Sequence, residues 1–282
     1  MIRYPLRVAG QMTRVLDSGG AGPLLVLVHG LGSRADRWER NIDRFAAHGY
    51  RAVALDLPGH GFASKDPDFD YSIEGYRKFL AAFLDEIGAE KAVLIGASLG
   101  GHIAGALAGT YPARVDALIM VGSTGLRPFG PEARAAAPKN LTDMSREAVQ
   151  ARLRRGILDA SYITDDLIDE DVQVNNSYGA GDALRQLGRY FAERIDDDIV
   201  LESLATLGGQ PPILLVWGAN DQSIPVAVGE AAHAGLPGSR LVILSDTAHN
   251  PYIDKPETFC RVVIDFLGGR LGALVAKDVT YR

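Results

Sequence analysis

The sequence has little of what marks several common classes of protein. It holds one cysteine, Cys260, in 282 residues, so an intramolecular disulfide is impossible. The apolar residues around Cys260 predict a buried thiol rather than a reactive one. Lys and Arg never form a run longer than two, and the net charge is −6. Both features argue against nucleic acid or an anionic membrane surface as a partner.

Signals for secretion or membrane insertion are also weak. The first apolar run starts only at Pro23, too late and too short for a signal peptide, so a cytoplasmic location is expected. The stretch 92–113 has no Asp, Glu, Lys or Arg over a length that would span a bilayer. Because it contains five glycines and Pro112, we expect a strand, a turn and a buried helix instead.

Short runs of Val, Ile and Leu alternate with amphipathic segments along the chain. Their apolar residues are consecutive, which indicates strands covered on both faces. This order predicts an α/β fold with a mostly parallel, doubly wound sheet and right-handed crossovers. The predicted core strands are 24–28, 52–55, 92–95, 117–121, 213–217 and 241–244, with an edge hairpin formed by 3–8 and 12–16.

The alternation stops between about residues 126 and 208, where helical patterns replace strands. An all-helical insertion in a parallel sheet predicts a cap over the carboxyl ends of the strands, where α/β folds bind ligands. The sequence thus divides into a core (1–125 and 209–270), a helical cap (126–208) and a loosely held C-terminal tail (271–282). The expected cap helices are 146–158, 165–174 behind Thr164 as N-cap, 183–193 and 199–207.

The sharpest local signal is the segment 96–101, which reads Gly-Ala-Ser-Leu-Gly-Gly between a predicted strand and a predicted helix. A G-x-S-x-G match is weak alone, but a strand, a tight turn and a helix form the context of a nucleophile elbow. Small neighbours let the chain turn sharply, and the free N–H groups of the helix start can meet negative charge. Ser98 is therefore the candidate nucleophile, and the alternative is a glycine-rich packing turn.

A serine nucleophile needs a base, and the base needs a third group to orient it. His249 follows the last core strand, and Asp221 follows the strand 213–217. In a parallel sheet both loops share the edge that carries Ser98. The order Ser, Asp, His is the one found in α/β-hydrolases. Asp246 and Asp254 are rivals to Asp221, but they are too close to His249 in sequence to occupy a separate strand end.

Other residues of this edge have supporting roles in the prediction. The segment 29–32, His-Gly-Leu-Gly, follows a strand, so the backbone N–H groups of Leu31 and Leu99 are the expected oxyanion-hole donors. His29, His48, His60, His102 and His233 are interpreted as structural. No His, Cys and carboxylate cluster has metal-site spacing and no G-x-G-x-x-G follows a strand, so neither a metal nor a cofactor is expected.

Together these motifs strongly resemble the α/β-hydrolase superfamily over about residues 23–267. The resemblance implies a capped serine hydrolase in which Ser98, His249 and Asp221 form a triad that works through an acyl-enzyme. The segments 122–126 and 157–164 resemble the esterases and meta-cleavage-product C–C hydrolases of this superfamily. It also implies a small-molecule substrate, while assembly into a homo-oligomer stays open.

Three positions depart from the C–C hydrolases, which typically carry Asn before the nucleophile, Trp after the histidine and an Arg in the cap. Here these positions are Ala97, Asn250 and, by local spacing, Asp171. Arg185 and Arg189 are the candidates for a carboxylate clamp from the cap. An ester, lactone or thioester hydrolase is therefore the first hypothesis. A C–C hydrolase of 2-hydroxy-6-oxo-dienoate substrates is the alternative, and a ligand receptor built on the same fold is a third.

Overall fold

The computed structural model describes residues 1–272 and 278–282. In this part of the chain the strands form one nine-stranded sheet in the order β1-β2-β4-β3-β5-β6-β7-β8-β9. Pairs from β4 to β8 are parallel, while β1, β2 and β9 pair antiparallel at the two edges. The strands are β1 Ile2–Val8, β2 Gln11–Asp17, β3 Leu24–Val28, β4 Arg51–Leu55, β5 Ala92–Ala97, β6 Val115–Val121, β7 Ile213–Gly218, β8 Arg240–Leu244 and β9 Val279–Tyr281.

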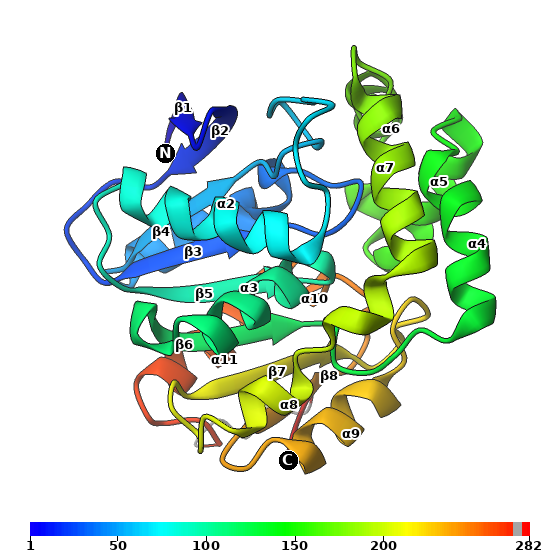
Figure 1. Cartoon of the computed structure of the whole chain (residues 1–282). Coiled ribbons are helices and arrows are strands. Elements are labelled where there is room, and N and C mark those ends of the chain that lie inside the picture. The colour runs from blue at the N-terminus through cyan, green and yellow to red at the C-terminus, as the bar shows by residue number, and fades with distance from the viewer. Residues whose placement is uncertain (273–277) are drawn as a thin grey trace.

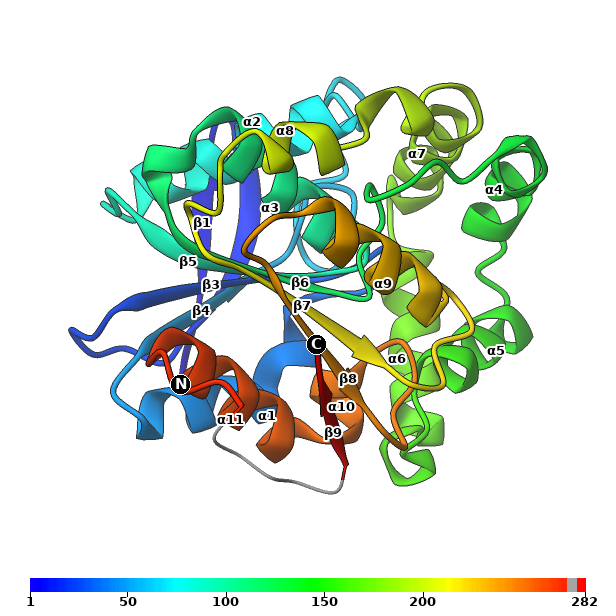
Figure 2. The same ribbon diagram turned by 90° about the horizontal axis from the view of Figure 1, so that it is seen from below.

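Helices cover both faces of the sheet, as the consecutive apolar residues of the strands predict (Figures 1 and 2). One face carries α2 Ile73–Glu86, α3 Leu99–Thr110, α8 Leu201–Ala205 and α9 Val226–Gly235; the other carries α1 Glu39–Ala47, α10 Pro251–Asp254 and α11 Pro256–Leu267. Strand β5 shows the division: Leu94 packs into the first core, and Val93 and Ile95 pack into the second. The predicted α/β class, the sheet and the edge hairpin are confirmed.

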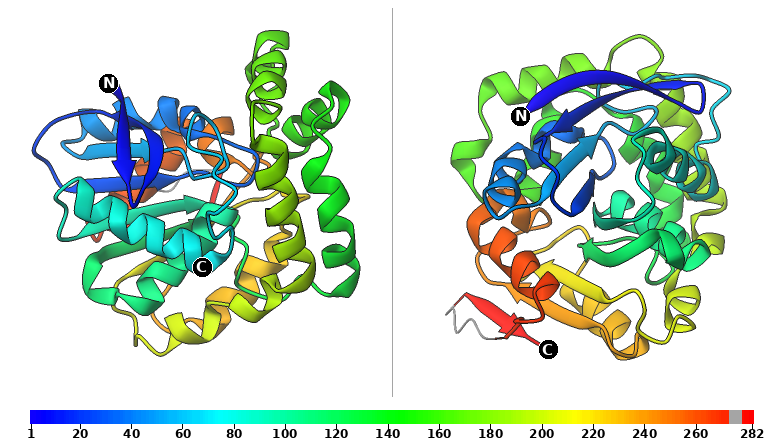
Figure 3. Two further views of the ribbon diagram at one scale, coloured as in Figure 1. Left: turned by 45° about the horizontal axis from the view of Figure 1, so that its top comes forward. Right: turned by 90° about the vertical axis from the view of Figure 1, so that its left-hand side faces the viewer.

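The cap consists of four helices between β6 and β7, and it stands at the carboxyl ends of the parallel strands (Figure 3, left). They are α4 Pro131–Thr142, α5 Arg146–Gly156, α6 Asp165–Asn175 and α7 Ala180–Glu193. Thr164 caps α6 by accepting a hydrogen bond from the Leu167 amide at 3.1 Å, as predicted. Met144, Val149, Ile168 and Leu184 form a small core of the cap's own.

Two boundaries differ from the expectation: the end of the cap and the start of the C-terminal tail. The Val200 amide donates to the Gly125 carbonyl at 2.8 Å, so the chain enters and leaves the cap side by side. Helix α8 then lies on α3 of the core, where a Cβ on Gly109 would approach the Ser203 hydroxyl to 2.7 Å. At the C-terminus, Val279–Tyr281 form β9 against β8 rather than a loose tail, because β8 leaves its outer edge free for pairing. Residues 273–277 of the predicted tail lie outside the described part.

The membrane-length stretch is strand β5, the turn at Ser98 and helix α3. Within the described residues, no helix combines the length and the apolar character that crossing a bilayer requires. Cys260 is buried as predicted, and burial raises the pKa of its thiol to about 12.

Phe259 of α11 is fully buried beside Trp38 and Tyr252, with ring-centroid distances of 6.2 and 6.0 Å. We expect Phe259→Ala to lower the free energy of unfolding by about 3–5 kcal/mol, because it removes a buried ring and leaves a cavity. Denaturant titration measures this. Tyr178→Ala is the control, since Tyr178 is fully exposed and should change stability by no more than about 0.5 kcal/mol. Equal losses in the two variants would contradict the expectation.

Candidate active site

Ser98 occupies a strained turn between β5 and α3. Its backbone has φ 54° and ψ −117°, a conformation that few residues other than glycine adopt. The turn is possible because the residues two positions before and after Ser98 have no side chains: a Cβ on Gly96 would approach the Gly100 carbonyl oxygen to 2.2 Å, and one on Gly100 would approach that of Val28 to 2.3 Å. The Ser98 amide donates to the Val121 carbonyl at 2.9 Å. Ser98 therefore stands above the sheet at the start of α3.

His249 and Asp221 meet across the loops that follow β8 and β7. Nδ1 of His249 lies 2.7 Å from Oδ2 of Asp221, whose side chain is fully buried. The other carboxylate oxygen accepts hydrogen bonds from the backbone amides of Ser223 and Ile224 at 2.8 and 2.9 Å, which fixes its orientation. Because Nδ1–H donates to Asp221, Nε2 of His249 is left as the acceptor.

Gly122 makes this contact possible, and the sequence motifs did not assign it this task. Its φ is +49°, and a Cβ there would lie 3.0 Å from Nδ1 of His249 and 3.1 Å from Oδ2 of Asp221. Any side chain at this position would therefore press on the pair. The signal in the sequence was only a glycine at the end of a predicted strand.

The two rival carboxylates of the histidine loop have other partners. The Asp246 side chain is 84% exposed and pairs with Lys255 at 3.4 Å. Asp254 accepts hydrogen bonds from the backbone amides of Ala248 at 2.8 Å, Leu158 at 2.8 Å and Asp159 at 2.9 Å. Asp254 thus joins the histidine loop to the segment that follows α5, and neither rival takes the place of Asp221.

Asn250 adds to this connection. Its backbone amide and its side-chain amide both donate to the Gly156 carbonyl, at 2.9 and 3.0 Å, and its side-chain oxygen accepts from the Tyr252 hydroxyl at 3.0 Å. Gly156 has no room for a side chain, since a Cβ there would lie 2.7 Å from Nδ2 of Asn250. The residue after the histidine therefore binds the C-terminal end of cap helix α5.

The loop after β3 lies against the serine turn. A Cβ on Gly30 would come within 3.1 Å of the Ser98 Cβ, and Leu31 lines the same cavity as Ser98. His29 holds this loop: its Nδ1–H donates to the Gly30 carbonyl at 2.7 Å, and its Nε2 accepts from the Leu57 amide at 2.9 Å. The amides of Leu31 and Leu99 remain the predicted oxyanion-hole donors, and Leu99 is the first residue of α3.

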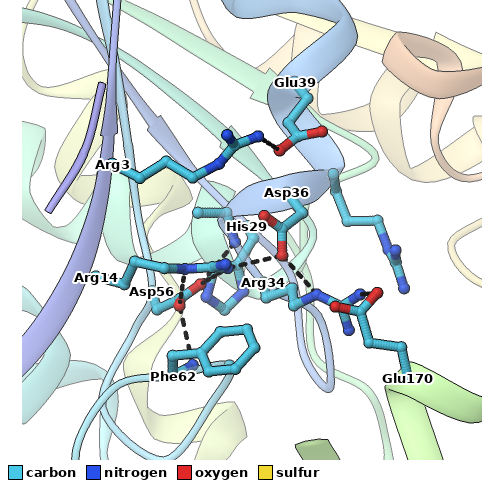
Figure 4. A network of polar contacts seen from close by, with 12 residues as sticks. Arg3, Arg14, His29, Arg34, Asp36, Glu39, Asp56, Phe62 and Glu170 are labelled. Atoms are coloured by element: carbon cyan, nitrogen blue, oxygen red, sulfur yellow. Dashed lines mark hydrogen bonds and ion pairs between the residues drawn. The ribbon is translucent and has the colours of Figure 1, made fainter. Parts of the chain in front are cut away.

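A chain of ion pairs connects the edge hairpin, this loop and the cap (Figure 4). Asp56, fully buried after β4, binds Nε of Arg14 at 2.9 Å. Arg14 also pairs with Asp36 at 2.7 Å, and Asp36 pairs with Arg34 at 2.6 Å. Arg34 reaches Glu170 of α6 at 2.6 Å. The loop that carries Leu31 is thus held between the core and the cap.

The cavity at Ser98 has a volume of about 240 Å³ and lies between the core loops and cap helices α5 and α6. Of the three predicted triad residues, Ser98 and His249 line this cavity, and Asp221 contacts His249 without lining it. The lining residues are Gly30, Leu31, Gly32, Ser33, Arg37, Ser98, Val149, Arg152, Leu153, Arg155, Gly156, Ile157, Asp171, Asn175, Ser223, His249, Asn250, Tyr252 and Ile253.

Asp171 and Arg37 are the buried charges of this cavity. Arg34 and Arg37 each donate to one oxygen of Asp171, and the three side chains are almost fully buried. The residue that local spacing predicts at the position of the cap arginine is thus an acid that pairs with two core arginines. Sequence reasoning noted the changed residue but had no signal for its partners.

Arg185 and Arg189, the predicted clamp, are not brought to Ser98. They line a separate hollow formed by α4, α7 and Pro67, which shares no lining residue with the Ser98 cavity. Arg185 is 62% exposed and pairs with Asp182 one turn away. The arginines that do line the cavity are Arg37, Arg152 and Arg155, and the sequence did not distinguish them from surface charges.

Three other histidines are buried and bonded to backbone carbonyls, as interpreted from the sequence. His29, His60 and His102 bind the carbonyl oxygens of Gly30, Pro58 and Asp198. Burial lowers their pKa values to about 4, about 3 and about 4. In the described residues, no group of three or more His, Cys, Asp or Glu is placed to hold a metal ion.

Comparison with known proteins identifies the family. The family described as the alpha/beta hydrolase fold matches residues 23–256. The chain belongs to the α/β-hydrolase fold family.

Relatives of this α/β-hydrolase include enzymes of more than one kind. It is 31% identical to a 2-hydroxy-6-oxononadienedioate/2-hydroxy-6-oxononatrienedioate hydrolase of Cupriavidus pinatubonensis, with 89% of each chain covered. It is also 31% identical to the dihydrolipoyllysine-residue acetyltransferase component of an acetoin cleaving system from Cupriavidus necator, covering 93% of this chain and 68% of that one. The structure of a meta-cleavage product hydrolase from Pseudomonas fluorescens IP01 superimposes with a TM-score of 0.79 at 24% identity, covering 94% and 97% of the two chains.

The buried histidines predict how stability depends on pH. Their pKa values in the folded state lie below the value of about 6.5 in an unfolded chain, so unfolding takes up protons as the pH falls through this range. We expect each to contribute about 2 kcal/mol to the loss of unfolding free energy between pH 7 and pH 5. His102→Gln should reduce that loss by this amount in denaturant titrations at the two pH values. His48→Gln, at an exposed position, is the control, and the same reduction there would contradict the assignment.

Proposed function

We propose that this protein is a serine hydrolase in which Ser98 is the nucleophile, His249 the general base and Asp221 the group that orients the histidine. The observation that carries the proposal is the 2.7 Å contact between His249 and Asp221 beside a cavity that also contains Ser98 on a strained turn. These side chains come from the ends of three different parallel strands, which is where α/β folds assemble sites.

The orientation of His249 suits this role. With Nδ1–H directed to Asp221, Nε2 accepts the Ser98 proton as the hydroxyl attacks a substrate carbonyl. Asp221 stabilises the resulting imidazolium, and the amides of Leu31 and Leu99 stabilise the oxyanion. His249 then protonates the leaving group and activates the water that hydrolyses the acyl-enzyme. An ester, lactone or thioester of a small acid is the substrate class that we propose.

C–C bond hydrolysis is the second candidate, and one observation favours it. The relative from Cupriavidus pinatubonensis is named as a hydrolase of dienedioates and trienedioates, and its chain aligns with this one over nearly its whole length. The cavity here differs from the expected C–C hydrolase pattern at Ala97, Asn250 and Asp171. The ester class therefore remains our first proposal.

Ser98→Ala should lower kcat on a short 4-nitrophenyl ester at least about 1000-fold, because it removes the proposed nucleophile. A fluorophosphonate probe should label the wild-type protein once, at Ser98, as read by peptide mass spectrometry. Ser177→Ala, at an exposed position of the cap, is the matched control and should keep wild-type kcat and labelling. Unchanged turnover by Ser98→Ala would reject the proposed nucleophile.

The two substrate classes are separated by comparing kcat/KM. We expect the value for 4-nitrophenyl acetate to exceed that for a 2-hydroxy-6-oxo-dienoate by at least about 10-fold, since the residues that handle a dienoate in the C–C hydrolases are replaced here. A reversed ratio, with both activities abolished by Ser98→Ala, would establish the second candidate in place of the first.

A further inference from the structure

The Ser98 cavity carries more positive than negative charge. Arg37, Arg152 and Arg155 line it, and Asp171 is its one lining carboxylate among the described residues. Buried or half-buried charges are costly unless an opposite charge or several hydrogen bonds compensate them. The distribution of partners among these arginines therefore indicates where a negative group is missing.

Asp171 does not compensate the cap arginines. One of its oxygens accepts from Arg34 and the other from Arg37, so the carboxylate is occupied by core residues. Arg155 is exposed, and no ion pair to it occurs within 4 Å in the described residues. The positive charge of α5 is thus left facing the cavity.

Arg152 is held in a defined orientation. Its Nη1 donates to the carbonyls of Asp143 at 2.7 Å and Asn140 at 3.3 Å, and its Nη2 contacts the sulfur of Met144 at 2.8 Å. No carboxylate of the described residues lies within 4 Å of it, and its Nε has no hydrogen-bond partner there. Burial lowers the pKa of this guanidinium below its ordinary value, although the charges of Asp143 and Asp171 act in the opposite direction.

Arg152 keeps donors for a further partner. Its Nε lies beside Nη2, which has two N–H groups and one contact, to Met144. This edge of a planar guanidinium can bind both oxygens of a carboxylate in parallel. Asn175 of α6, buried and lining the same cavity, can add an amide donor. The backbone carbonyls of Asp143 and Asn140 fix the plane in advance, so little side-chain entropy is lost on binding.

We propose that Arg152 binds a carboxylate of the substrate, so that the enzyme prefers acyl compounds with an anionic group remote from the scissile carbonyl. Arg155, exposed on the same helix, attracts the anion to the cavity. This inference rests on the proposed function of Ser98. It replaces the clamp expected at Arg185 and Arg189 by one on α5.

The test compares two substrates that differ in one charge: 4-nitrophenyl hydrogen succinate and its methyl ester. Wild-type protein should have the higher kcat/KM for the free acid. Arg152→Gln should lower the acid-to-ester ratio by about 10–100-fold, the range for a hydrogen bond to a charged group. Arg152→Lys, which keeps the charge without the paired donors, should give an intermediate ratio. Arg154→Gln, an exposed neighbour outside the cavity, should keep the wild-type ratio.

Direct binding gives a readout that does not depend on turnover. Calorimetric titration of Ser98→Ala with methyl hydrogen succinate should show binding that weakens with added salt. Adding Arg152→Gln should weaken this binding by the same factor by which it lowers the acid-to-ester ratio. Dimethyl succinate, which has no carboxylate, should not bind. Equal binding of the two esters, or an equal effect of Arg154→Gln, would overturn the inference. Turnover of the neutral ester without preference for the acid would overturn it while leaving the role of Ser98 intact. Absence of fluorophosphonate labelling at Ser98 in the wild-type protein would instead count against Ser98 as the nucleophile.

Discussion

Close backbone contact at the serine turn is the constraint on which the rest of the site depends. Gly100 lies so near the carbonyls of Val28 and His29 that any side chain would force β3 and α3 apart. At this close contact the backbone of Ser98 adopts a positive φ of 54°. The same contact brings the start of α3 and the loop after β3 together, so the proposed nucleophile and the predicted oxyanion donors lie at one corner of the sheet. Gly122 has the equivalent task at the histidine.

The core and the cap contribute different kinds of group to the cavity. Ser98, His249 and Asp221 all belong to the core, although the cap is inserted between the first of them and the other two. The cap supplies walls and charge. Its helix α6 is held to the core by the pairs of Asp171 with Arg34 and Arg37, which are buried and so are weakly screened by salt.

Sequence reasoning succeeded where local pattern decides structure. Consecutive apolar residues identified the buried strands, and a strand followed by glycines and a helix identified the turn at Ser98, because both depend on neighbours in the chain. His249 and Asp221 were paired from the expected sheet topology and from the order Ser, Asp, His along the chain, and their side chains do meet.

The cap residues escaped the same reasoning because their surroundings depend on how helices pack. Arg185 and Arg152 both lie on cap helices, and nothing in the sequence says that α5 rather than α7 faces Ser98. Strand β9 was missed for a similar reason: three residues become a strand only because the edge of β8 is available to them. Pairings between distant segments have no local signature.

The hydrogen bonds of Asn250 and Asp254 to the end of α5 link two parts of the site that are far apart in sequence. These bonds couple the position of the helix that walls the cavity to that of the loop that carries His249. A displacement of α5 would therefore act on the histidine loop as well as on the wall of the cavity.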